Sequence, residues 1–218
     1  MAYKKYPKGQ RSPGDIQQQL GIGKALLDGQ HEDDLHWQWG RSHDCSRAIS
    51  GESARLLGLP NYQPARATGC AHESIARDFL SFVASSRPQT SPRYSGHALP
   101  REQADALVPG STIRLPLTSM TESIYVASHL GGRPRRGEVG VVYRFEPGTK
   151  AFKFSAGSGL PPGFGPPKAE WITAGDFVVS ARRPYRHKAL HHDVWLVSLV
   201  PSRSTTTPRF AGSQRMVM

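Results

Sequence analysis

Three short stretches of the sequence carry side chains that could do chemistry on a bound molecule. They are Arg93–His97, which reads Arg-Tyr-Ser-Gly-His, Thr118–Thr121, which reads Thr-Ser-Met-Thr, and the single carboxylate Glu170. A positioned carboxylate can hold a hydroxyl group and offset a growing positive charge. A charged arginine or histidine can make strong hydrogen bonds to an anion. The plainer alternatives are hydroxyls that only cap a helix and a glutamate that only faces solvent.

The hydrophobic pattern places Glu170 at the start of a strand. Apolar residues follow it, so strands are expected over Glu170–Thr173 and Phe177–Ser180. Ala174 and Gly175 lie between the two runs and predict a turn. The carboxylate should therefore lie at the edge of a sheet.

The hydroxyl-rich stretch lies between a strand and a helix. The strand is expected over Ile113–Leu117. The helix is expected over Glu122–Leu130, with Thr121 as its N-cap and Gly131 at its end. Thr118–Thr121 should therefore form the connection between them.

The clearest amphipathic helix is expected over His72–Ser85. Ile75, Phe79, Phe82 and Val83 form one apolar stripe along it. Such a stripe must pack against another element, and the strands that follow supply one.

The remaining pattern favours a mixed sheet with segregated helices. Ser50 should cap a short helix that Gly58 and Pro60 end. The further elements are expected over Ser50–Leu57, Arg101–Leu107, Val139–Phe145, Ala151–Phe154 and Val194–Val200. This arrangement indicates an α+β fold.

The chain of 218 residues is long enough for one hydrophobic core with additional segments. An N-terminal accessory region with a mobile basic arm is predicted at 1–70, and a main domain at 71–200. Ser, Thr, Pro and Arg dominate 201–218, which is predicted to be a flexible tail.

The charge and the cysteines limit the class of protein. The formal net charge is +11, which attracts nucleic acid, acidic proteins or a polyanionic cofactor. With only Cys45 and Cys70, a disulfide-stapled scaffold is excluded. The chain shows no signal-peptide pattern and no run that could cross a bilayer, so we expect a cytoplasmic protein without a membrane partner. Secretion without a cleaved signal, and packaging in a virion, stay open.

In their order and context, the three stretches resemble the toxin-type mono-ADP-ribosyltransferases, in a divergent form of the arginine-serine-glutamate branch. The resemblance covers roughly 71–200. It implies an α+β fold with a split β-core of two packed sheets and flanking helices. It also implies an enzyme that moves ADP-ribose from NAD to a macromolecular acceptor, either protein or nucleic acid. Transferases of this kind occur in bacteria and bacteriophages, and the arginine-rich composition suits a phage protein.

The resemblance implies the two catalytic residues. Glu170 matches the glutamate of the family, which stabilises an oxocarbenium-like transition state. Ser119 matches a serine that supports the NAD ribose and orients that glutamate. Thr118 and Thr121 are alternates in the alignment, and both are expected near the cofactor.

The resemblance also implies a cofactor-binding strand, made of Arg93, Tyr94, Ser95, Gly96 and His97. The family carries Tyr-Arg-Gly there, so Ser95 stands in place of the arginine that braces the dinucleotide phosphates. Arg93 comes one residue before Tyr94 and would point to the opposite face of a regular strand. His97 could contact the cofactor instead, as a histidine does in the diphtheria-toxin-like branch.

A second departure from the family concerns the acceptor. Arginine-modifying members carry a glutamate two residues before the catalytic one, where this chain has Lys168. A lysine cannot draw a proton from an arginine substrate, so Asn, Thr, Cys, a nucleobase or water stay open as acceptors. The preceding loop with Phe164, together with Lys168 and Trp171, is the segment that commonly helps the family choose its target.

Two further interpretations follow from the same sequence. Ser95, Lys168 and the +11 charge also favour a catalytically degenerate relative that serves as a structural or nucleic-acid-binding protein, for example in a virion. A nucleic-acid acceptor would satisfy both hypotheses. No metal is predicted, because the pairs His43-Cys45 and Cys70-His72 lack the spacing of common zinc sites.

Overall fold

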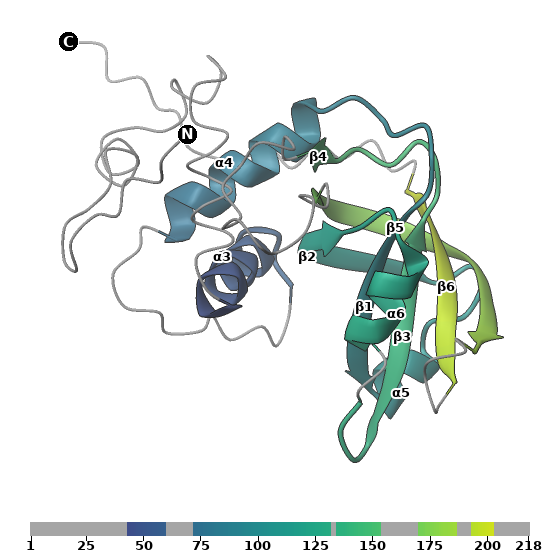
Figure 1. The fold of residues 1–218 in the computed structure, drawn as a ribbon. Coiled ribbons are helices and arrows are strands. Elements are labelled where there is room, and N and C mark those ends of the chain that lie inside the picture. Colours follow the sequence, from purple (N-terminus) through teal and green to yellow (C-terminus); the bar gives the residue numbers. More distant parts are fainter. Residues whose placement is uncertain (1–42, 60–71, 132–133, 154–169, 187–192, 203–218) are drawn as a thin grey trace, which may run out of the picture.

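In the computed structural model of the chain, the described residues are 43–59, 72–131, 134–153, 170–186 and 193–202. They form a mixed sheet with helices packed around it (Figure 1). In chain order the elements are α3 (His43–Leu56), α4 (His72–Ser85), β1 (Arg93–Pro100), α5 (Arg101–Asp105), β2 (Thr112–Met120), α6 (Ile124–Gly131), β3 (Glu138–Phe145), β4 (Phe152–Lys153), β5 (Trp171–Tyr185) and β6 (Val194–Pro201). The predicted α+β class is confirmed.

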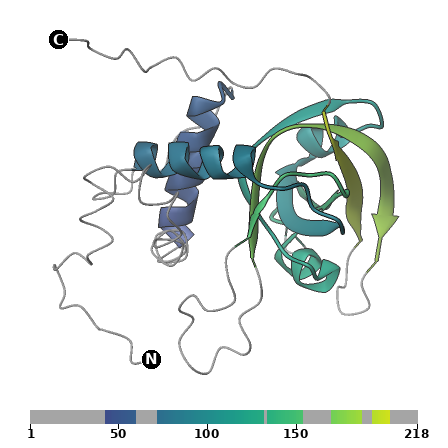
Figure 2. The same cartoon turned by 90° about the horizontal axis from the view of Figure 1, so that it is seen from above.

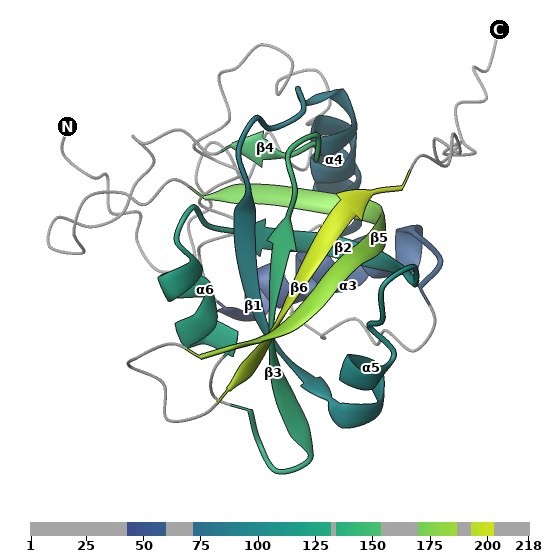
Figure 3. The ribbon, with the colours of Figure 1, turned by 90° about the vertical axis from the view of Figure 1, so that its right-hand side faces the viewer.

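The sheet divides into two halves that cross. The strand order is β1-β3-β6-β5-β2, and β4 pairs with β5. Only β3 and β6 are parallel among these pairs. Figure 3 shows β1, β3 and β6 side by side, while β2 and the first part of β5 cross behind them. This is the split β-core that the resemblance implies.

The long strand β5 belongs to both halves. Its 15 residues pair with β2 and β4 near the start and with β6 near the end. The predicted turn at Ala174 and Gly175 is wrong, because β5 runs through both residues. Gly175 has φ 121° and still pairs with Leu115 of β2, so the glycine absorbs a local distortion instead of ending the strand.

β1 and β2, which lie at opposite ends of the strand order, meet at one bridge. The N–H of Tyr94 donates to the carbonyl of Thr121, and the N–H of Thr121 donates to the carbonyl of Tyr94, both at 2.8 Å. Figure 2 shows how the strands curve round to allow this meeting. The bridge makes two of the three candidate stretches neighbours.

The helices pack on the sheet through separate apolar clusters. α3 and α4 cover β2 and the start of β5 with a cluster that includes Ile49, Phe79, Leu117 and Ile172. α6 covers β3 and β6 through Ala127. The largest cluster lies between β2, β3, β5 and β6 and includes Leu115, Met120, Val141, Phe145, Val179 and Leu199.

The predicted helix over His72–Ser85 is confirmed as α4. The predicted start of the preceding helix is wrong: α3 already begins at His43, so Ser50 lies inside it and is not its N-cap. Gly58, with φ 68°, follows the end of α3 as predicted. In the ranges the structure describes, no helix is long and apolar enough to cross a membrane.

The start of α6 also differs from the prediction. The helix begins at Ile124, and the hydroxyl of Ser123 accepts the N–H of Val126 at 3.4 Å. Thr121 therefore lies too early to be the N-cap; its hydroxyl accepts the N–H of Ser123 at 3.2 Å and shapes the turn before the helix.

α3 lies in the predicted accessory region but shares a core with the main domain. Ile49 of α3 packs in one cluster with Phe79 of α4 and Leu117 of β2. The hydrophobic core therefore extends back at least to α3. The boundaries of the three regions stay predictions.

Candidate active site

The structure brings Ser119 and Glu170 into direct contact. Ser119 lies near the end of β2, and Glu170 immediately precedes β5. Because Ser119 pairs with Ile172 in the antiparallel ladder, the residue before β5 lies beside the end of β2. The hydroxyl of Ser119 donates to Glu170 Oε1 at 2.5 Å, and both side chains are partly exposed. A hydroxyl and a carboxylate thus share one accessible edge of the sheet.

The two alternates of Ser119 have other partners. Thr118 is buried, and its hydroxyl donates to the carbonyl of Pro116 at 2.8 Å. Thr121 takes part in the bridge to Tyr94. Of the three hydroxyl residues, Ser119 is therefore the one that bonds to Glu170.

Arg93 stacks on Trp171, the residue that follows Glu170, and its side chain is largely buried. Its guanidinium carbon is 4.0 Å from the centre of the Trp171 ring, and its side chain is 12% exposed. Nη2 pairs with Glu122 Oε1 at 3.1 Å, and Nη1 donates to Ser91 Oγ at 2.7 Å. Nε is buried and has no hydrogen-bond partner among the described residues. A planar guanidinium on an aromatic face gains a cation–π attraction.

Trp171 is the platform for that arginine. The ring is 5% exposed, and Lys153 Nζ lies 5.3 Å from its centre. The predicted role of Trp171 in choosing a substrate stays a prediction. Phe164 and Lys168, assigned to the same role, lie outside the described residues.

Ser95 and His97 lie farther along β1 and are hydrogen-bonded to each other. Ser95 Oγ and His97 Nε2 are 2.9 Å apart in a hydrogen bond, and Ser95 is 7% exposed. The His97 ring packs against Tyr143, with 4.9 Å between ring centres. Burial lowers the pKa of His97 to about 4, so the pair is neutral near pH 7. The cofactor-binding role predicted for these residues stays a prediction.

Side chains alternate between the two faces of β1, and this alternation places Arg93 and Ser95 on the same face. Tyr94 packs in the cluster under α6, whereas Ser95 is turned the other way towards Tyr143. Residues two apart share a face of a strand, so Arg93 lies on the face of Ser95 and opposite Tyr94. Arg93 thus shares a face with Ser95, the position at which the resemblance implies an arginine. Gly96 lies between Ser95 and His97 and faces the side of Tyr94.

Sequence reasoning missed three residues that contact Arg93 or the strand that carries Ser119. Glu122 pairs with Arg93, while Ser50 and Ser53 of α3 bond to the backbone of Leu117 in β2. Glu122 directly follows the hydroxyl-rich stretch, which was a signal of proximity. No pattern in the sequence connects Ser50 or Ser53 with β2.

The predicted absence of a metal stays a prediction. No group of three or more His, Cys, Asp and Glu side chains that could hold a metal ion occurs in the part of the chain that the structure describes. Cys70 and the side chains of His43, Cys45 and His72 fall outside that part.

The chain has the fold of the ADP-ribosyltransferase toxins. Vis toxin from Vibrio splendidus is similar with a TM-score of 0.52 and 14% identity, over 93% of this chain and 92% of that one. The Clostridium limosum C3 exoenzyme matches with a TM-score of 0.52 and 13% identity, over 83% and 93% of the two chains. An ADP-ribosyltransferase from Clostridium botulinum matches with a TM-score of 0.50 and 12% identity, over 91% and 100%. No protein-family model and no curated protein match the sequence.

Proposed function

We propose that this protein is a mono-ADP-ribosyltransferase that moves ADP-ribose from NAD to a macromolecular acceptor. The observation that carries the proposal is the hydrogen bond from Ser119 to Glu170, made across β2 and β5 in a fold shared with such enzymes. The two residues are distant in the sequence, with a separation of 51, so their meeting is a property of the fold.

Glu170 supplies the charge that this reaction needs. Breaking the bond between nicotinamide and ribose leaves positive charge on the ribose ring, as in glycoside hydrolysis. A carboxylate stabilises that charge and can accept a hydrogen bond from a ribose hydroxyl. Ser119 fixes the rotamer of Glu170 before the substrate arrives, and a carboxylate has acceptor capacity beyond one hydroxyl.

Arg93 is the group that we assign to the phosphates of NAD. It is stacked on Trp171, the residue that follows Glu170, and its Nε has no partner among the described residues. Its ion pair with Glu122 is with a side chain that is 62% exposed, so a phosphate can replace this partner at little cost. Arginine recognises phosphate well because its planar fork offers two parallel N–H groups.

The acceptor is a macromolecule of a class other than arginine side chains. Lys168 stands where arginine-modifying members of the family carry a glutamate, and an ammonium group accepts no proton from a guanidinium. Protein side chains such as Asn, Thr or Cys, and nucleobases, fit this departure. A bacteriophage origin remains a prediction from the composition alone.

Incubation with labelled NAD tests the proposed activity. The wild type should release nicotinamide slowly on its own and should label a macromolecule when a cell extract is added. The Glu170→Ala variant should lose both activities while it unfolds at the same urea concentration as the wild type. Equal nicotinamide release by the two proteins would refute the assigned role of Glu170.

A degenerate binding protein is the second candidate function. It is favoured by Ser95, which is buried against His97 and puts no charge where the family has one, and by the net charge of +11. In that case the protein should bind DNA with an affinity that falls log-linearly with salt, and it should not cleave NAD. No retention on DNA even at low salt would exclude this candidate.

A further inference from the structure

The strand that carries Ser119 is interrupted just before it. Leu115 of β2 pairs with Gly175, and the next pair is Thr118 with Thr173, so two residues of β2 oppose one of β5. Of the two residues on the β2 side, Pro116 has no N–H to give to the ladder. A bulge of this kind re-aims the residues that follow it. The other, Leu117, needs partners elsewhere for its backbone groups.

Helix α3 provides both partners of Leu117. The hydroxyl of Ser50 donates to the Leu117 carbonyl at 2.9 Å, and the Leu117 N–H donates to Ser53 Oγ at 2.9 Å. Ser53 in turn donates to the carbonyl of Ser50 at 2.6 Å, and its side chain is fully buried. Two serines one helical turn apart therefore bind the backbone of one residue in an edge strand.

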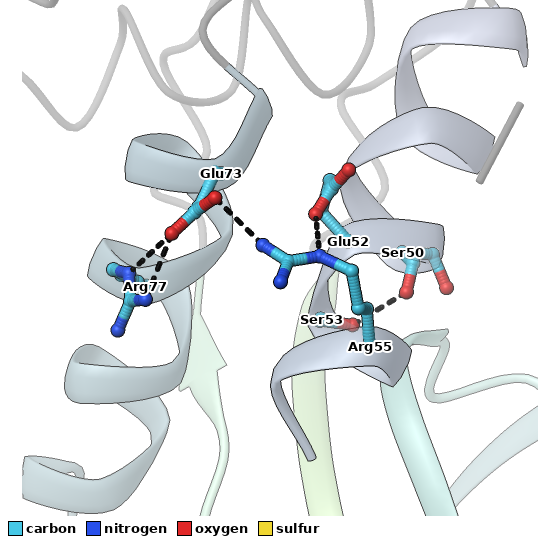
Figure 4. Close-up of polar contacts among 6 residues, drawn as sticks. All are labelled: Ser50, Glu52, Ser53, Arg55, Glu73 and Arg77. Carbon is cyan, nitrogen blue, oxygen red and sulfur yellow. Dashed lines mark hydrogen bonds and ion pairs between the residues drawn. The ribbon is translucent and has the colours of Figure 1, made fainter. Parts of the chain in front are cut away.

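The helix that carries these serines is itself anchored. Arg55 of α3 pairs with Glu73 of α4 at 2.6 Å, and Glu73 also holds Arg77 (Figure 4). The guanidinium of Arg114 in β2 donates to the carbonyl of Leu57, beyond the end of α3, at 3.0 Å. α3 is thus tied to α4 and β2 while it holds Leu117, and it covers an edge that would otherwise lack partners.

We propose that Ser50 and Ser53 are positioning residues that fix the register of β2 so that Ser119 meets Glu170. Leu117 lies two residues before Ser119, and a slip of one residue would turn Ser119 to the other face of the sheet. The bulge makes such a slip possible, and the two hydrogen bonds from α3 oppose it. This inference rests on the proposed function for its effect on activity, but not for its effect on the strand.

The kinetics of the Ser53→Ala variant measure how much the hydroxyl of Ser53 contributes to activity. The kcat for NAD cleavage should fall about tenfold, equivalent to about 1.4 kcal/mol, with the KM for NAD changed less than twofold. Ser50→Ala should act in the same direction, and Ser50→Thr, which keeps a hydroxyl, should restore most of the rate. Ser128→Ala is the matched control, because Ser128 is also fully buried in a helix and its hydroxyl donates to Tyr125 of the same helix. The control should keep its kcat.

A double-mutant cycle separates positioning from a general loss of stability. If Ser53 acts through Ser119, then Ser53→Ala should have almost no further effect on kcat in a Ser119→Ala background. A tenfold loss in both backgrounds would overturn the inference. If Ser53→Ala does not fold, the same cycle with the partly buried Ser50 decides the question.

Hydrogen exchange tests the strand without reference to catalysis. The amides of Thr118–Met120 should exchange at least tenfold faster in Ser53→Ala than in Ser128→Ala under native conditions. Unchanged exchange there would refute the inference even if NAD is cleaved. Faster exchange in a protein whose wild type never cleaves NAD would refute the proposed function and leave the positioning role standing.

Discussion

Two serine-centred pairs in this molecule have similar geometry and different surroundings. Ser119 bonds to Glu170 at 2.5 Å, and Ser95 bonds to His97 at 2.9 Å. The first pair is partly exposed, while the second lies against Tyr143, where burial lowers the pKa of His97 to about 4. A charge that stays in contact with solvent can act on a substrate as an ion, whereas the second pair is neutral near pH 7 and its serine is buried. The difference supports the proposal that the first pair serves chemistry, while the cofactor-binding role of Ser95 and His97 stays a prediction.

Removing the charge of Glu170 should have the largest effect. Glu170→Gln keeps an oxygen that can accept from Ser119 but carries no negative charge, so kcat should fall by about 10²–10³. His97→Gln is the matched change in the other pair and should leave kcat within a factor of two. Steady-state rates of nicotinamide release measure both. A comparable loss of kcat in the two variants would break the comparison.

Removing the hydroxyl of Ser119 should have the next largest effect. A hydrogen bond to a charged group contributes about 1.5–3 kcal/mol, so Ser119→Ala should lower kcat roughly ten- to a hundredfold. Ser95→Ala removes the corresponding hydroxyl of the buried pair and should change the midpoint of urea unfolding, with kcat preserved. Thr118→Ser serves as a control close to Ser119, because its hydroxyl bonds to Pro116. A normal kcat in Ser119→Ala would show that Glu170 needs no orientation.

Changing Arg93 should act on binding more than on rate. Arg93→Met keeps much of the apolar contact with Trp171 but loses the charge, so the KM for NAD should rise about tenfold with a smaller change in kcat. Isothermal titration with NAD checks the same point directly. Arg183→Met, which alters an exposed arginine of β5, is the control. Unchanged NAD affinity in Arg93→Met would remove the phosphate-binding role.

The last effect concerns stability at acid pH and not activity. His97 binds its proton near pH 4 when folded and near 6.5 when unfolded, so the unfolded state binds more protons between these values. The free energy of unfolding should therefore fall as the pH drops from about 6.5, by up to about 1.4 kcal/mol per pH unit. Asp78 has the opposite sign, because burial raises its pKa to about 6 and the folded state takes up the proton first.

Comparing the wild type with His97→Gln separates the effect of His97 on the free energy of unfolding from the effect of Asp78. Urea unfolding between pH 4 and 7 measures the free energy of unfolding of both proteins. The value for the wild type should fall relative to that for His97→Gln as the pH falls, since only the wild type loses stability through His97. Parallel curves would show that His97 titrates normally in the folded protein. The surroundings of the Ser95–His97 pair would then be closer to those of the Ser119–Glu170 pair than the packing of His97 indicates.

Local patterns in the sequence predicted elements better than partners. The stripe through Ile75, Phe79 and Val83 predicted α4 with its ends, because the apolar face of a helix depends only on residues within a few turns of one another in the sequence. Ser50 looked like an N-cap, but it faces a strand that lies 67 residues away in the chain. A polar residue that bonds across the fold and one that caps a helix have the same local sequence. Such roles depend on tertiary pairing and could not be predicted.

The candidate site was predictable in its residue types and only partly in its geometry. The resemblance selected Ser119 and Glu170, and the structure places them in hydrogen-bond contact. The placement of Arg93 on Trp171 depends on the bridge between β1 and β2, which no periodicity reveals. His97 was selected because a histidine contacts the cofactor in the diphtheria-toxin-like branch, and the structure shows that its Nε2 is hydrogen-bonded to the buried Ser95.

The place of β6 in the sheet has a consequence for biosynthesis. This strand is the last described in the chain, yet it lies in the middle of the order β1-β3-β6-β5-β2. The half with Arg93 and the half with Ser119 and Glu170 therefore lack their common neighbour until β6 is inserted. A chain still being translated, or cut before Val194, should carry every residue of the proposed site without an assembled site. Nascent and clipped forms are then expected to be inert, and activity would report completion of the fold.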